Sequence, residues 1–343
     1  MKNIAFLKFF FIILNILSAV NPVFCQEDQQ NLVQQNRKYG FTVGGGFGVL
    51  NGQALELVYS VPGETNGEFL SELIWEMKPV LYAGINADFG LTDILSGPGF
   101  FSSLAIKAGI PGKTGIMEDR DWMSVENDAL THFSSHENKT NALIWIDLYV
   151  GASIPIKFLY IKPFISGSWM HFDFTAKNGY YKYAKENPEG SGKYEPIKDA
   201  QNISLSGDVI SYQQDWLLLA AGFSIGTNIL SPFSFDLSFQ ISPLTYCAAT
   251  DNHFFLDSNY VATTKYIVYK DFSSFGLFIE PKVSFSLDLE KIKFSLDTSY
   301  RYISKTEGEA YYSLDNKKFY PIPNKAGAEL SVMNLQFTVK VKL

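Results

Sequence analysis

The feature that most constrains this chain is a strict alternation of apolar and polar residues, sustained over runs of about ten residues. Residues 233–242 place Phe, Leu or Ile at every odd position and Ser, Asp or Gln at every even position. Residues 283–289, 292–302 and 335–343 show the same alternation. Successive side chains of a strand point to opposite faces, so each run predicts a strand with one apolar and one polar face.

The length of these runs separates two all-β architectures. A water-soluble sandwich would also show alternation, with its apolar face turned to a core. However, a tilted strand that crosses a bilayer needs about 9–11 residues, whereas strands of soluble proteins usually have about 5 or 6. Aromatic residues near the ends of runs, such as Trp145, Trp216 and Tyr300, are typical of the girdles at membrane interfaces. We therefore predict an all-β fold, an antiparallel transmembrane β-barrel of about ten strands.

The segments between the runs predict where the loops lie. Only Glu290 and Lys291 separate two of the runs, as in a tight hairpin, and 230–232 is also short. The long polar segments are 119–141, 185–206, 250–264 and 306–325. Outer-membrane barrels have short periplasmic turns and long extracellular loops, so we expect long extracellular loops on one side of this barrel.

The first 25 residues are typical of a secretory signal peptide. Lys2 and Lys8 precede an apolar run at 9–20, and cleavage is expected after Cys25. A lipid anchor on Cys25 is the alternative, and bulky Phe24 argues against it. No later segment contains some 18 consecutive apolar residues, so helical spans are not expected, and 26–343 is predicted to form a single barrel domain.

Composition limits the possible partners and sites. The formal net charge is −7 at pH 7, which argues against a nucleic-acid partner and favours cationic ligands. Once the signal peptide is removed, Cys247 is the only cysteine. An intramolecular disulfide and a metal site made of thiolates are therefore excluded for 26–343, and Cys247 is expected to be a small buried residue.

Two short motifs carry groups suited to acid–base chemistry. Asp119 and Asp121 are two residues apart, as are Asp251 and His253, and this spacing places each pair on one face of a strand. All four fall in or at the edge of the long polar segments, which predicts one side of the barrel for both pairs. Taken alone, Asp-x-Asp is usually a turn and Asp-x-His is usually incidental, so the spacing does not identify an enzyme.

The sequence around both motifs resembles one family. Residues 117–123 (Met-Glu-Asp-Arg-Asp-Trp-Met) resemble the omptin segment Met-x-Asp-x-Asp-Trp-Met, and 251–253 (Asp-Asn-His) resemble its Asp-Glu-His. Further similar stretches lie at 55–59, 71–75, 131–140 and 172–181. The chain thus resembles, over nearly all of 26–343, the omptins, which are outer-membrane endopeptidases of Gram-negative bacteria.

This resemblance implies a function and a set of site residues. Asp119, Asp121, Asp251 and His253 would be catalytic, with a water held between Asp119 and His253, in a site that faces the cell exterior. Glu56 matches one of the acidic residues with which the family binds basic side chains, which implies cationic peptide or protein substrates. The other acidic position of the family, two residues before the catalytic Asp, is occupied here by Ala249.

The resemblance also bears on cofactors and partners. We expect no metal and no other cofactor; a metal site made of His132, His136 and Asp128 is the alternative to their being solvated loop residues. Omptins bind lipopolysaccharide through a Tyr-Gln-Glu-Ser-Arg pattern, and the matching residues 167–171 read Gly-Ser-Trp-Met-His, which leaves activation by lipopolysaccharide open. Outer-membrane lipid is expected to surround a monomeric barrel.

Two other classes of function remain open at this stage. The first is a non-enzymatic outer-membrane β-barrel, either an adhesin or a small pore, and the second is a soluble exported β protein. The presence of Asp119, Asp121, Asp251 and His253 together favours the peptidase, since a binding barrel has no need of them. A pore is disfavoured because side chains fill most of the lumen of a barrel of about ten strands.

Overall fold

The computed structural model describes residues 37–93, 99–157, 159–227 and 232–343. The predicted signal peptide and residues 230 and 231 of an expected turn lie outside these ranges. Within them, no helix is both long and apolar enough to cross a membrane.

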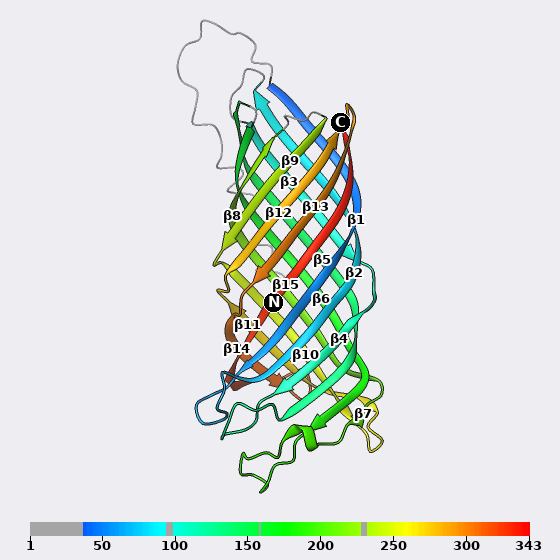
Figure 1. Cartoon of the computed structure of the whole chain (residues 1–343), viewed down its shortest axis with the longest axis vertical. Helices are drawn as coiled ribbons and strands as arrows, with labels where there is room; N and C mark the ends of the chain where they lie inside the picture. The colour runs from blue at the N-terminus through cyan, green and yellow to red at the C-terminus, as the bar shows by residue number, and fades with distance from the viewer. Residues whose placement is uncertain (1–36, 94–98, 158, 228–231) are drawn as a thin grey trace, which may run out of the picture. The chain divides into compact units, whose positions relative to one another are not determined.

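Nearly all of the regular structure is antiparallel strand (Figure 1). The strands are β1 (Arg37–Tyr59), β2 (Phe69–Asp93), β3 (Gly99–Gly109), β4 (Gly112–Asp121), β5 (His132–Ile156), β6 (Leu159–Tyr183), β7 (Ile203–Ser204), β8 (Asp208–Thr227), β9 (Phe233–Ser242), β10 (Thr245–Leu256), β11 (Ala262–Ser274), β12 (Phe278–Asp288), β13 (Ile292–Ile303), β14 (Glu307–Ser313) and β15 (Tyr320–Lys342). Among the described residues, one 3-10 turn, η1 (Ile197–Asp199), lies between β6 and β7.

Strand pairing closes the sheet into a barrel. β3 and β4 both pair with β2 and β5, so together they make one long strand that is interrupted near Pro111. β9 with β10, β11 with β12, and β13 with β14 form three further strands of this kind. The last strand, β15, pairs with β1, for example at Phe337 and Phe47. The described strands thus form a closed ring of ten, which confirms the predicted antiparallel barrel.

The apolar face of the alternating runs points outward. On β9, Phe233, Phe235 and Leu237 are 40–49% exposed, whereas Ser234 and Gln240 are 8% exposed or less. A soluble sandwich would show the opposite arrangement, with its polar residues exposed. Large exposed apolar residues continue this outer band around the barrel, and they include Phe47, Ile85, Ile165, Phe223, Phe285, Leu296 and Met333.

The strands are longer than the sequence predicted. β2, β5 and β6 each have 25 residues, more than a bilayer crossing requires. Consequently the prediction that these residues are loops was wrong: 119–121 lie on β4, 132–141 on β5, 250–256 on β10, 307–313 on β14 and 320–325 on β15. Beyond the bilayer both faces of a strand are polar, and polarity alone does not distinguish such a strand from a loop.

The remaining connections keep the predicted asymmetry. At one end of the barrel, shown at the top of Figure 1, 289–291 joins β12 to β13 through a bond from the Leu289 amide to the Ile292 carbonyl. At the other end the connections are longer, and 184–207 between β6 and β8 contains β7. The Val125 amide donates to the Gly192 carbonyl, which ties the β4–β5 connection to this long one.

Large side chains fill the part of the lumen next to the end with the longer connections. Trp75 stacks with Phe174 and Tyr212, with ring centroids 5.6 and 5.4 Å apart. Trp145 and Trp216 are fully buried in the same cluster, so their prediction as interfacial girdle residues was wrong. Tyr300, in contrast, is 43% exposed on the outer wall. Burial of these indoles inside the barrel anchors the strands around a packed core.

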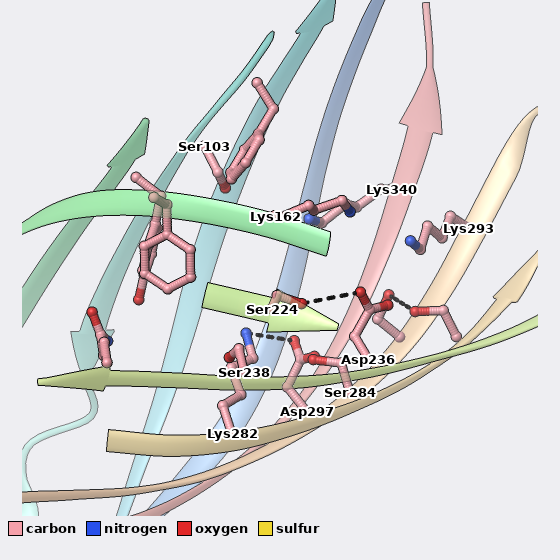
Figure 2. A pocket seen from close by; sticks show the side chains of 16 residues that line it. Ser103, Lys162, Ser224, Asp236, Ser238, Lys282, Ser284, Lys293, Asp297 and Lys340 are labelled. Carbon is pink, nitrogen blue, oxygen red and sulfur yellow. Dashed lines mark hydrogen bonds and ion pairs between the residues drawn. The ribbon is translucent and has the colours of Figure 1, made fainter. Parts of the chain in front are cut away.

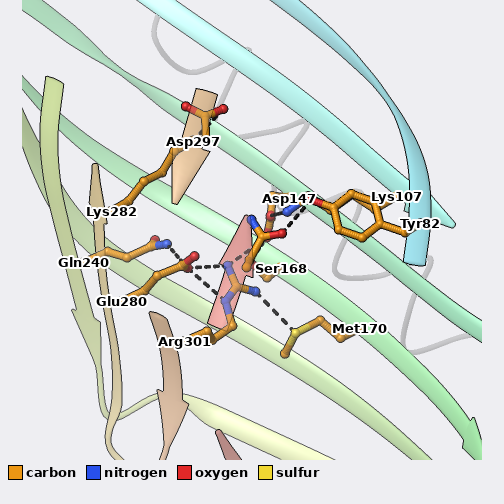
Figure 3. Close-up of polar contacts among 11 residues, drawn as sticks. Tyr82, Lys107, Asp147, Ser168, Met170, Gln240, Glu280, Lys282, Asp297 and Arg301 are labelled. Atoms are coloured by element: carbon orange, nitrogen blue, oxygen red, sulfur yellow. Dashed lines mark hydrogen bonds and ion pairs between the residues drawn. The ribbon is translucent and has the colours of Figure 1, made fainter. Parts of the chain in front are cut away.

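A buried charged layer lies next to this core (Figure 3). The Arg301 side chain is fully buried, donates through Nε to Glu280 at 2.9 Å and through Nη2 to Asp147 at 3.2 Å, and covers the Trp145 ring. Lys107 lies 3.9 Å from Asp147. These pairs satisfy the charges that a polar lumen would otherwise leave unpaired.

The part of the lumen nearer the short connections is polar and more open (Figure 2). It forms a cavity of about 210 Å³ whose lining includes Lys162, Lys282, Lys340, Asp236 and Asp297. The aromatic core and the Arg301 layer therefore lie between this cavity and the opposite end of the barrel.

Candidate active site

The Asp119 and Asp121 pair lies on the inner face of β4. In the strand pairing Asp119 is opposite Leu73, which is buried, and Asp121 is opposite Ser71. The Ser71 hydroxyl donates to Asp119 at 3.4 Å. β4 and β2 thus direct both carboxyl groups into the lumen, as the two-residue spacing predicted.

The second pair lies on β10. The Asp251 carboxylate contacts Nε2 of His253 directly, and Asp251 is only 2% exposed. The edge of the His253 ring packs against Tyr269 of β11, with ring centroids 5.4 Å apart. The imidazole is therefore held from two sides, by a buried carboxylate and by an aromatic ring, and its Nδ1 is the ring nitrogen not engaged by Asp251.

Asp119 and His253 face the same cleft. The cleft has a volume of about 320 Å³ and is open to solvent, and 36% of the His253 side chain is exposed in it. Its other lining residues are Ser134, His136, Tyr181, Tyr183, Leu205, Val209, Ile210, Phe254, Leu256, Asp257 and Tyr260. Residues from strands distant in the sequence thus bring a carboxyl group and an imidazole to one space.

The cleft lies beyond the apolar outer band. The residues that alternate with the Asp119 pair point outward, where Arg120 pairs with Glu118 and lies 3.8 Å from Glu72. Asn252, between Asp251 and His253, donates to Ser211 at 2.9 Å. Charged and amide groups on the outer wall are costly in hydrocarbon, so this part of the barrel is outside the bilayer.

The carboxyl groups of the cleft retain protons more strongly than isolated ones. Burial raises the pKa of Asp119 to about 8, helped by the negative charges of Asp121 and Asp251 and opposed by His253. Burial also raises the pKa of Asp121, which the Ser71 hydroxyl and His253 partly counteract. Like charges crowded in a poorly solvated site cannot all be ionised at low cost.

His253 has the opposite balance between burial and charge. Burial lowers its pKa, but the charge and hydrogen bond of Asp251, with the charges of Asp119 and Asp121, outweigh burial and raise the pKa to about 9. An imidazole held in this way takes up a proton readily, which suits a group that must accept a proton from a reacting water.

Glu56, the predicted substrate-binding residue, also lies in this region. It is 4% exposed on β1, opposite Leu73 of β2, which in turn is opposite Asp119. Burial raises its pKa, and the charges of Asp251, Asp271 and Asp119 raise it further. Glu56 therefore belongs to the same acidic group as the two motifs.

Asp271 was not predicted as a site residue, and the structure adds it to this group. Asp271 is 7% exposed on β11, and burial together with the charge of Asp251 raises its pKa to about 8. Its only signal in the sequence is an acidic residue at an inward position of a strand, and no local pattern shows which residue of β10 faces it.

The histidines of the predicted loop also belong to the barrel wall. His136 is 2% exposed on β5, where its Nε2 is 2.8 Å from the Ser134 hydroxyl and its Nδ1 contacts the Asn178 carbonyl. His132 begins β5 and packs against Tyr183. The prediction that they are solvated loop residues was wrong, because β5 extends well past the bilayer. Cys247, in contrast, is buried as expected.

One solved structure agrees with this architecture. The barrel is similar to the crystal structure of the outer membrane protease OmpT from Escherichia coli, with a TM-score of 0.72 and 18% sequence identity over 92% of this chain and 99% of that one. The outer membrane protein OprG from Pseudomonas aeruginosa gives a TM-score of 0.36 and 10% identity over 91% and 99% of the two chains. None of the curated protein sequences matches significantly. The model of the Omptin family matches residues 37–343, and the chain therefore belongs to the omptin family.

Proposed function

We propose that this protein is an outer-membrane endopeptidase that hydrolyses peptide bonds with a water activated between Asp119 and His253. The observation that carries the proposal is the shared cleft, in which Asp119 of β4 and His253 of β10 face one space while Asp251 contacts the imidazole from behind. Membership of the omptin family and the likeness to the fold of a protease support it.

In the proposed mechanism each group has one task. Asp119 orients the water, and His253 accepts its proton as the oxygen adds to the peptide carbonyl. The imidazolium then donates this proton to the leaving nitrogen as the C–N bond breaks. Asp251 keeps the imidazole oriented and stabilises the imidazolium as it forms, as a carboxylate does behind histidine in other hydrolases. Asp121 adds negative charge beside Asp119 and so helps to set the protonation of the pair.

The surroundings of the cleft support a peptidase more than a pore. The aromatic core and the Arg301 layer fill the lumen between the cleft and the end with the short connections. The longer connections surround the opening of the cleft. We propose that 1–25 is removed on export, that the cleft opens to the cell exterior, and that extended peptides with basic side chains bind across it. No cofactor is needed for this chemistry, and addition of lipopolysaccharide to the assay tests whether it activates the protein.

The direct test is cleavage of a peptide library by the folded barrel. His253→Ala and Asp119→Ala are expected to lose most activity, because each removes one of the two groups that hold the water. His171→Ala is the matched control, since His171 forms a similar pair with Asp215 at 3.0 Å on the outer wall, away from the cleft.

Wild-type turnover in a folded His253→Ala protein would refute the mechanism. Absence of cleavage by a wild-type preparation that shows the heat-modifiable mobility of a folded barrel would instead support the non-enzymatic alternative, an adhesin or a small pore. Both outcomes are read from the same gels and product maps.

A further inference from the structure

The polar cavity near the short connections is lined by more lysines than carboxylates. It has a volume of about 210 Å³, and its charged lining residues are Lys162, Lys282, Lys293, Lys340, Asp236 and Asp297. In Figure 2 Lys162, Lys293 and Lys340 lie on one side of this cavity. The cavity is inside the barrel wall, because Asp236 alternates on β9 with the outward-facing Phe235. A ligand of these charges must therefore enter through the lumen and not from the lipid.

Two of the four lysines already have a carboxylate partner. Lys340 donates to Asp88 at 2.6 Å, and Lys282 lies 3.7 Å from Asp297. The other two lysines have no carboxylate within ion-pair distance among the described residues. Their ammonium groups carry charge that no direct contact neutralises.

The strand pairing places Lys293 against a like charge. Lys293 of β13 is directly opposite Lys340 of β15. Directly opposed residues of antiparallel strands point to the same face, about 5 Å apart at Cβ, and like charges in this arrangement repel. Asp288, which is opposite Lys293 on β12, binds Lys342 instead. The repulsion between the two opposed lysines is therefore only partly relieved.

Lys162 is held in the cavity by aromatic rings. Its ammonium group lies 4.3 Å from the centroid of the Tyr160 ring and 5.9 Å from that of Phe101. Such cation–π contacts attract the charge but leave N–H groups free to donate elsewhere. Lys293 and Lys340 are close enough for their charges to act on Lys162. Ammonium groups from β6, β13 and β15 thus face one space.

The remaining carboxylate of the cavity is engaged by hydroxyl groups. Asp236 accepts from the Tyr160 hydroxyl at 2.6 Å and from Ser224 at 3.4 Å. Its single negative charge is set against the two lysines that have no ion-pair partner. The cavity therefore keeps a net positive charge.

A further donor lies on the same row of the inner wall. Gly44 of β1 is opposite both Lys340 and Asn86 of β2, so these residues share one level and one face. A Cβ atom at Gly44 would lie 2.7 Å from Cγ of Lys340, so the glycine leaves room for the lysine stem. Nδ2 of Asn86 is buried and has no hydrogen-bond partner among the described residues. This row thus has donors in excess of acceptors.

We propose that this cavity binds a small, soluble oxyanion of the phosphate type, held by Lys162, Lys293 and Lys340. Such an anion supplies both the negative charge and the acceptor oxygens that these ammonium groups lack. It would enter from the end with the short connections, which is the periplasmic end in outer-membrane barrels. The aromatic core and the Arg301 layer separate the cavity from the cleft, so the inference does not depend on the proposed function.

Equilibrium dialysis with radiolabelled inorganic phosphate tests this site. The folded barrel is kept in a neutral detergent, and sodium chloride holds the ionic strength constant, so that binding reports a preference for the oxyanion over chloride. We expect saturable binding of one phosphate per barrel. Lys162→Gln/Lys293→Gln should weaken binding by about 10-fold or more, because charge-assisted hydrogen bonds are lost.

A matched control removes the same number of charges elsewhere. Lys317→Gln/Lys318→Gln changes two exposed lysines of the connection between β14 and β15, at the other end of the barrel, and should leave the affinity for phosphate unchanged. Equal affinity in the wild-type protein and in folded Lys162→Gln/Lys293→Gln would overturn the inference, as would the absence of saturable binding by the wild-type protein. The heat-modifiable mobility of each variant shows whether its barrel is folded.

Asp236→Asn provides a test in the opposite direction. It removes the cavity carboxylate that has no lysine partner and keeps an oxygen that can accept from Tyr160, so the affinity for phosphate should rise by up to about 5-fold. If Lys162→Gln/Lys293→Gln fails to fold, an unchanged affinity in Asp236→Asn overturns the inference instead.

Dialysis in lipid nanodiscs separates a soluble ligand from a lipid headgroup, which carries the same phosphate chemistry. A soluble oxyanion should bind equally well when phosphatidylglycerol replaces part of the phosphatidylcholine, since the wall of the barrel separates the cavity from the lipid. Displacement of the labelled phosphate by phosphatidylglycerol would assign the lysines to a headgroup and would overturn the proposal of a soluble ligand.

Discussion

Replacement of Asp251 by asparagine tests the coupling between the buried carboxylate and His253. The side chain keeps its shape but loses the charge that contacts Nε2. The rise of the His253 pKa from 6.5 to about 9 has three contributors, namely Asp251, Asp119 and Asp121. At about 1.36 kcal/mol per pKa unit it corresponds to about 3.4 kcal/mol in favour of the imidazolium.

Two corrections reduce this figure. Solvent screens the interaction because 36% of the His253 side chain is exposed, and Asp119 and Asp121 contribute a share. We assign about half, ~1.7 kcal/mol, to Asp251, in line with the ~1.5–3 kcal/mol of a hydrogen bond to a charged group. If the transition state contains the imidazolium, kcat/KM measured above the pKa of His253, where the imidazole is neutral in both proteins, should fall about 20-fold in Asp251→Asn.

The pH dependence gives a second, independent readout. His253 acts as a base only after it has lost its proton, so wild-type kcat/KM should rise with pH toward about 9. In Asp251→Asn the pKa of His253 falls, and the midpoint of this rise should move to lower pH. The assay is cleavage of a fluorogenic peptide between pH 5 and 10, with Asp208→Asn as control, because Asp208 forms an exposed ion pair with Lys177 at 2.8 Å. An unmoved midpoint, or a 20-fold loss in the control, would refute this account.

Two further predictions concern the barrel itself. Arg301→Ala leaves the buried Glu280 and Asp147 carboxylates without their shared partner, so the free energy of unfolding in urea should fall by about 3–5 kcal/mol. A loss below about 1 kcal/mol would show that the charged layer contributes little to the stability of the barrel. Leu237→Arg puts a charge on the apolar outer wall and should lower the free energy of unfolding in lipid vesicles by about 2–4 kcal/mol. Lys265→Glu, at an exposed position of β11, should leave this free energy nearly unchanged. Equal losses in the two variants would argue that this part of β9 is not in the bilayer.

The alternation along the chain determined the architecture. A period of two residues over runs such as 233–242 is sufficient to predict strands, and their length predicts a membrane barrel rather than a sandwich. The same period placed Asp251 and His253 on one face, where the structure finds them in contact. These are local properties, because the direction of a side chain along a strand depends only on its position in that strand.

Tertiary structure decided which polar segments are strands and which residues meet across the lumen. Outside the bilayer a barrel strand has polar side chains on both faces, so β4, β5 and β10 were mistaken for loops where they leave the membrane. Trp145 was assigned to an interface because no local signal shows that its side of β5 faces a packed core.

The register between strands is likewise not a local property. The sequence shows only that Ala249 lies two residues before Asp251. The pairing of β10 with β11 places Asp271 opposite it, 22 positions later in the chain. Register follows from the closure of the whole ring, in which every strand is fixed by both neighbours. The chemical types of the candidate site could therefore be read from the sequence, whereas its full set of carboxyl groups required the folded barrel.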